Sequence, residues 1–103
     1  MELSGRALAG TIRSVAPLEG ARVPAYRLEI DFGPAGVRSS SAQLTDRHAP
    51  EDLVGRQVVA LVDLGQKRIA GFVSEVLVLG LPSPRGVVLL APDAPVADGA
   101  EVS

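Results

Sequence analysis

Two pairs of polar residues, a basic pair and a Ser-Glu pair, have the clearest capacity for chemistry in this sequence. Lys67 and Arg68 precede a glycine turn, and Ser74 and Glu75 interrupt the apolar strand that follows the turn. A carboxylate in an apolar strand is costly to bury unless it is paired or hydrogen-bonded. We therefore expect Glu75 to be largely buried and hydrogen-bonded, although a solvent-facing glutamate at a strand entrance fits the same pattern. The apolar residues expected to share its strand face are Val73, Leu77 and Leu79.

Further polar residues extend these pairs into a candidate binding groove. Guanidinium and ammonium groups suit phosphate, whereas serine and glutamine side chains can bond base edges or peptide backbone. The alternative interpretation is a solvated loop that carries ordinary surface arginines. The residues expected to line the groove are Arg38, Ser40, Gln43, Lys67, Arg68, Phe72, Ser74 and Glu75.

Groups that could carry out catalysis are scarce. The run Ser39, Ser40 and Ser41 could supply a nucleophile, but no nucleophile-elbow motif surrounds it, and a polar strand is the simpler interpretation. The absence of cysteine excludes disulfides and thiolate chemistry, and a single histidine, His48, excludes a multi-histidine metal site within one chain. No glycine-rich phosphate loop leads from a strand into a helix. We therefore expect a protein that is not an enzyme.

Composition indicates a single globular domain over residues 1–103. The chain has 103 residues, of which 47% are hydrophobic, enough for one modest core. Its net charge of -2, from 10 basic and 12 acidic residues, excludes the broad basic field of a general nucleic-acid binder, so any such role must rest on a local patch. The sequence has no signal-peptide pattern and no stretch long enough to span a membrane. We expect a cytoplasmic protein without membrane insertion.

The elements that must position these residues are mainly β-strands. Residues 26–32 alternate cleanly, with Tyr26, Leu28, Ile30 and Phe32 on one face, which is typical of a half-buried strand. One short helix is predicted to begin at Pro50 and to stop at Gly55. The other predicted strands cover residues 8–15, 37–44, 57–62, 72–79 and 87–90.

The order of these elements predicts an all-β protein. Three strands, a short helix and further strands are the order of the OB-fold, a Greek-key β-barrel with one short helix between its third and fourth strands. An SH3-like barrel is the structural competitor, and the helix after the third strand favours the OB-fold. OB-folds that bind single strands stack bases on aromatic side chains. Tyr26 and Phe32 fall on an apolar face, so Phe72 is the aromatic residue expected in the groove.

Several segments, taken in order, carry a family resemblance. They are ARVPA (residues 21–25), LEIDFG (28–33), SSAQLT (40–45), RIAGF with SEVLVLG (68–80), and the tail APDAPV (91–96) with Gly99. These segments resemble the CsaA secretion-chaperone family, which belongs to the wider tRNA-binding domain group found in tRNA-binding proteins and in some aminoacyl-tRNA synthetases. The resemblance spans nearly the whole chain.

The resemblance implies a cytoplasmic OB-fold homodimer that uses no cofactor. It implies tRNA binding in the wider group, and binding of unfolded or precursor polypeptides for export in the CsaA branch. The basic loop residues and the Ser-Glu pair of the group correspond to Lys67, Arg68, Ser74 and Glu75. The wider group commonly has Gly-Met after Ser-Glu, where this chain has Val-Leu, as in the CsaA branch. The N-terminus also lacks the usual aromatic-bearing lead-in, which leaves that part of a dimer contact undefined.

Two functions therefore remain open. One is a dimeric export chaperone that binds polypeptides, with export machinery as a further candidate partner. The acidic balance and the scarcity of aromatic residues favour this function. The other is a structure-specific tRNA-binding protein that uses the same groove, which the ancestry of the fold favours. A structural dimer that binds neither is the third option.

Overall fold

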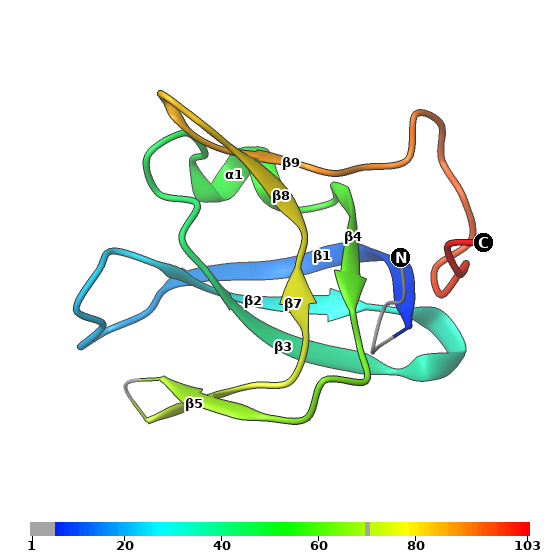
Figure 1. Ribbon diagram of the computed structural model, residues 1–103, viewed down its shortest axis with the longest axis horizontal. Coiled ribbons are helices and arrows are strands. Elements are labelled where there is room, and N and C mark those ends of the chain that lie inside the picture. Colours follow the sequence, from blue (N-terminus) through cyan, green and yellow to red (C-terminus); the bar gives the residue numbers. More distant parts are fainter. Residues whose placement is uncertain (1–5, 70) are drawn as a thin grey trace.

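The polypeptide folds into a mostly β structure, and the computed structural model describes residues 6–69 and 71–103 (Figure 1). Five strands form an antiparallel sheet in the order β3-β2-β1-β4-β7. Their bounds are β1 (Ala7–Pro17), β2 (Tyr26–Asp31), β3 (Val37–Ala42), β4 (Gln57–Leu61) and β7 (Leu77–Val78). The remaining elements are the hairpins β5 (Lys67–Ile69) with β6 (Phe72–Ser74) and β8 (Gly80–Ser83) with β9 (Gly86–Leu89), the 3-10 turn η1 (Gly33–Ala35), and the helix α1 (Pro50–Leu53) between β3 and β4.

Strand β1 bends the sheet into a barrel because its two halves pair with different neighbours. Residues 7–11 pair with β4, whereas residues 11–17 pair with β2. The register with β2 shifts between Ile12 and Ser14, so Arg13 occupies a bulge. A bulge increases the local twist and bends the strand. The single long strand can therefore pair with β2 along one half and with β4 along the other, as a small barrel requires.

The barrel is nearly closed by a seam between β3 and β7. The Ser39 carbonyl of β3 accepts the N–H groups of Glu75 (2.9 Å) and Val76 (3.3 Å), just before β7 begins. In Figure 1, β7 runs between β3 and β4. This architecture is OB-fold-like, and it confirms the predicted fold class with the helix between β3 and β4.

The core lies inside this barrel and uses the predicted apolar face of β2. Leu28, Ile30 and Phe32 are fully buried, and Tyr26 is nearly so. Gly10 of β1 lies against two of these side chains, since a Cβ at that position would come within 2.7 Å of both Ile30 and Phe32. The strand alternation read from the sequence is therefore confirmed.

Two elements differ from the sequence-based expectation. Residues 67–69, expected in a loop, form β5 and pair with β6. The single strand expected over residues 72–79 is instead divided into β6 and β7. The division falls at Glu75, where the backbone turns to bond with Ser39 rather than continuing one ladder.

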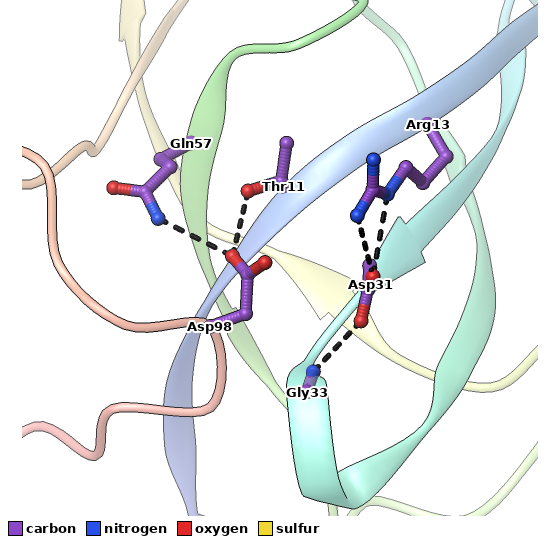
Figure 2. A network of polar contacts seen from close by, with 6 residues as sticks. All are labelled: Thr11, Arg13, Asp31, Gly33, Gln57 and Asp98. Carbon is purple, nitrogen blue, oxygen red and sulfur yellow. Dashed lines mark hydrogen bonds and ion pairs between the residues drawn. The ribbon is translucent and has the colours of Figure 1, made fainter.

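The C-terminal segment lies along the start of β1 (Figure 1). The N–H groups of Gly99 and Val102 donate to the carbonyls of Ala9 and Ala7, at 2.8 and 2.9 Å. Asp98 anchors the segment by accepting the hydroxyl of Thr11 at 2.6 Å (Figure 2). Within the described ranges, no helix is long and apolar enough to cross a membrane.

Candidate functional site

The Glu75 carboxylate links the bend between β6 and β7 to strand β3 by hydrogen bonds. Its Oε1 accepts the Ser39 N–H at 3.1 Å and the Ser39 hydroxyl at 3.0 Å. The expected hydrogen bonding is therefore confirmed. The expected burial is only partly met, because Glu75 is half-buried and sits in the bend rather than on a strand face with its apolar neighbours.

Ser74 adds a further hydrogen bond between this segment and β3. Its side chain is buried, and its hydroxyl accepts the Ser41 N–H at 3.0 Å and donates to the Val76 carbonyl at 3.2 Å. The Ser-Glu pair thus bonds both backbone and side-chain groups of β3. It closes one end of the seam between β3 and β7.

Beyond this closed end the seam opens into an apolar groove that consists of two adjoining depressions. The larger depression, of about 430 Å³, lies between the β1–β2 loop, the end of β3, β7 and β9. The apolar residues that define it best are Leu18, Val23, Ala42, Leu77, Val78 and Leu89. The smaller depression, of about 310 Å³, lies between Ser74, Leu77 and the loop residues Leu64–Gln66. Ser41 and Leu77 line both depressions.

Charge is scarce in the apolar groove. Among the side chains that the structure describes, Arg22 is the one charged residue that lines either depression. Val23 and Leu77 keep 52% and 49% of their surface exposed there. Apolar side chains gathered in an open depression mark a binding surface. The side chains that line the groove are suited to non-covalent contacts with apolar groups.

Some of the residues predicted for the site do meet in the groove. Gln43 is exposed and lines the larger depression, and Ser74 lines the smaller one. Ser40 is fully buried, with its hydroxyl bonded to the Ser41 carbonyl at 3.2 Å. Side chains alternate along a strand, so Ser41 is the serine that faces the groove.

Other predicted residues lie elsewhere. Arg38 donates its Nε–H to the Ala35 carbonyl at 3.2 Å, near the start of β3 and away from the groove. Phe72 is half-buried and, with Arg27, lines two further depressions over the outer side of β1 and β2. Arg68 is exposed on β5, and the side chain of Lys67 lies outside the described part of the structure.

Sequence reasoning missed most of the apolar lining. The β1–β2 loop supplies Leu18 and Val23, and its only local signal is the presence of large apolar residues in a segment rich in glycine and proline. The lining residues of β7 and β9 read as ordinary strand residues. Their contribution to a groove depends on contacts between distant segments.

The ion pair between Arg13 of β1 and Asp31 of β2 has a structural role. The Arg13 guanidinium donates to Asp31 at 2.8 Å, and Asp31 also accepts the Gly33 N–H at 2.8 Å (Figure 2). The hydrogen bond from Arg13, together with that from Gly33, holds the pKa of the Asp31 carboxyl below its ordinary value. Both groups fix local chain geometry and neither lines the apolar groove.

Comparison with known proteins shows relatives of two kinds. The family model described as a putative tRNA binding domain matches residues 8–101. Segments of methionine--tRNA ligases also match: the one from Methanococcoides burtonii is 32% identical over 85 residues, which is 82% of this chain and 12% of the ligase. The chain thus spans about an eighth of the length of the curated relatives it matches.

Solved structures of chaperones match over almost the whole chain. The CsaA chaperone of Bacillus anthracis str. Ames is 50% identical, with a TM-score of 0.90 over 97% of this chain and 92% of that one. The CsaA chaperone of Picrophilus torridus is 38% identical, with a TM-score of 0.92 and the same coverage. Because the family model matches most of the sequence, the chain belongs to the putative tRNA-binding domain family and is a homologue of CsaA chaperones.

Proposed function

We propose that this protein is a CsaA-like export chaperone that binds unfolded or precursor polypeptides in the cytoplasm as a homodimer. The observation that carries the proposal is the apolar groove between β3 and β7, in which Arg22 is the one charged lining residue among the described side chains. A polypeptide that has not folded exposes apolar side chains, and burying them in an apolar groove is favourable. The resemblance to CsaA chaperones supports the same conclusion.

The polar residues of the groove suit the backbone of such a client. Ser41 and Gln43 line the larger depression and can donate to or accept from peptide groups. Binding of this kind is reversible and needs no covalent step. It holds apolar segments away from one another, which suppresses aggregation.

A homodimer would present two such grooves to one client. The hairpin of β8 and β9 supports this arrangement, because its cross-strand neighbours Leu81 and Val88 are 57% and 37% exposed. A two-fold dimer could cover this pair. Two linked grooves would raise the apparent affinity for a long client through a high effective concentration.

The alternative function is tRNA binding. Membership of the family and the match to segments of methionine--tRNA ligases favour it. The groups available for it are Lys67 and Arg68 on β5 and the pair Phe72 and Arg27. Against it, Glu19 and Glu29 line the same depressions as Arg27, which offsets the positive charge there.

A competition experiment tests the proposed function. An unfolded precursor segment and tRNA are offered to the same protein at physiological salt, and the aggregation of an unfolded client is followed by light scattering. We expect the protein to suppress aggregation and tRNA to compete poorly. If tRNA binds tightly while peptides neither bind nor suppress aggregation, the chaperone proposal is wrong. In that case, replacing Lys67 and Arg68 by Ala should flatten the salt dependence of tRNA binding, whose log–log slope is about -0.7 to -0.9 per phosphate contact.

A further inference from the structure

We propose that the apolar groove selects extended polypeptides in which two apolar side chains are separated by one residue, at positions i and i+2. This inference rests on the proposed function, since it takes the groove to be the polypeptide site. It adds a rule for which clients bind. The rule follows from the backbone of β7, from the division of the groove and from its charge.

Strand β7 presents one side of its backbone to the open part of the seam. The Leu79 N–H donates to the Val59 carbonyl at 2.9 Å, on the β4 side, whereas the Val76 N–H donates to the Ser39 carbonyl across the seam. Backbone groups alternate from side to side along a strand, so Val78 faces the seam as Val76 does. Within the described ranges, neither the N–H nor the carbonyl of Val78 has a hydrogen-bond partner across the seam. An extended chain can add to such an unpaired strand side.

Leu77 and Ser41 divide the groove into its two depressions. Both residues line the larger and the smaller depression, so the two depressions share one lining residue on each side of the seam. In an extended chain, side chains i and i+2 point to the same face and lie roughly 6.6 Å apart, whereas side chain i+1 points away. A strand laid along the seam can therefore place residues i and i+2 on either side of Leu77. Neighbouring residues i and i+1 cannot fill both depressions.

The charge of the groove specifies one further property of the client. Arg22 lines the larger depression, is exposed, and is the charged residue among the described lining side chains. An acidic residue beside the anchor that occupies this depression would be attracted to its guanidinium. A basic residue at the same place would be repelled.

A peptide series tests the spacing rule on the unaltered protein. Fluorescein-labelled nine-residue peptides with a Ser, Thr and Gly background carry either one Leu or two Leu residues at spacings i,i+1, i,i+2 and i,i+3. Binding is measured by fluorescence anisotropy. We expect the i,i+2 peptide to bind about tenfold more tightly than each of the others, because only that peptide buries both leucines.

Blocking variants assign each leucine to a depression. Val23→Trp fills the larger depression and Gln66→Trp fills the smaller one, and both residues lie in loops. We expect each variant to reduce the affinity of the i,i+2 peptide to that of the single-Leu peptide. Val54→Trp is the matched control, because Val54 is 52% exposed like Val23 but lines neither depression, and it should leave binding unchanged. Arg22→Glu should reverse the preference for an acidic over a basic flanking residue.

The outcomes separate the spacing rule from the proposed function. If peptides bind and Val23→Trp blocks them, but all two-Leu spacings bind equally, the spacing rule is overturned and the groove remains the polypeptide site. If no peptide binds, or if Val23→Trp and Gln66→Trp behave like Val54→Trp, the rule and the proposed polypeptide site are both overturned.

Discussion

At the scale of single residues, Ser74 and Glu75 stabilise the fold through hydrogen bonds to β3, and these bonds define one end of the apolar groove. Glu75 bonds the backbone and the hydroxyl of Ser39, and Ser74 bonds the backbone of Ser41. Together they close the seam at one end and leave it open at the other. Burying a carboxylate in an apolar strand is costly. Glu75 is tolerated because the chain bends there and because the N–H and the hydroxyl of Ser39 on β3 donate to its carboxylate.

Replacing Glu75 by Ala should therefore destabilise the protein. The change leaves the N–H and the hydroxyl of Ser39 without their acceptor, at a cost of about 1–3 kcal/mol in the free energy of unfolding. Urea unfolding measures the effect. Glu29→Ala is the control, because Glu29 is an exposed carboxylate on β2, and it should leave stability nearly unchanged. Equal stability of both variants would mean that Glu75 is only a surface charge.

Asp31 should give the protein a pH-dependent element of stability. Arg13 and Gly33 lower its pKa in the folded state, so the ionised carboxylate favours folding. This contribution is present above the ordinary Asp pKa of about 3.9 and is lost as the pH falls through the lower folded-state value. Asp31→Asn should thus be less stable than the parent at pH 7. The difference in unfolding midpoint should disappear in acid, and a difference that persists there would contradict this linkage.

At the scale of elements, β1 and the C-terminal segment depend on each other. The bulge at Arg13 lets β1 pair with both β2 and β4, and the C-terminal segment covers the first residues of β1. Asp98 accepts the Thr11 hydroxyl (Figure 2). Gln57 of β4 donates its amide N–H to the Val96 carbonyl at 2.7 Å. The C-terminal segment is therefore held to β1 and β4 by both backbone and side-chain hydrogen bonds.

Asp98→Ala should loosen this segment. The Thr11 hydroxyl and the Gln57 amide lose a shared acceptor, and the free energy of unfolding should fall by about 1–2 kcal/mol. Hydrogen exchange should also speed up at the N–H groups of Gly99 and Val102, which bond to β1. Asp93→Ala, an exposed aspartate in the preceding loop, is the matched control. Unchanged exchange in Asp98→Ala would show that the backbone bonds alone hold the segment.

At the scale of the whole molecule, the apolar groove and the depressions lined by Phe72 lie on different parts of the barrel. The apolar groove lies at the open seam, whereas Phe72 and Arg27 lie over the outer side of β1 and β2. The groove predicted from the sequence placed Phe72 in one site with Gln43 and Ser74, which line the apolar groove. The structure instead places Phe72 with Arg27, outside the apolar groove.

The proposed homodimer should depend on the hairpin of β8 and β9. Leu81→Asp places a charge beside the exposed Val88, and its burial in an interface would be costly. Size-exclusion chromatography with light scattering at micromolar concentration should show a dimer for the parent and a monomer for the variant. Val54→Asp, at an equally accessible apolar position, should remain dimeric. A parent protein that is monomeric at this concentration would rule out the dimer.

Local sequence patterns determined the class of the fold and its main elements. The alternation over residues 26–32 defined which side of β2 is buried, and Pro50 marked the start of α1. Both signals are local, because strand period and helix-end preferences involve residues close in the chain. The bonded state of Glu75 also followed from the cost of burying a charge.

Only the tertiary structure decided where the groove lies and which residues line it. The groove joins the β1–β2 loop, the end of β3, β7 and β9, which are brought together only when the barrel closes. The break of one expected strand into β6 and β7 depends on hydrogen bonds across the seam. Such contacts link residues more than 30 positions apart, as with Ser41 and Ser74. No local propensity encodes them, because their energy exists only once both segments are in place.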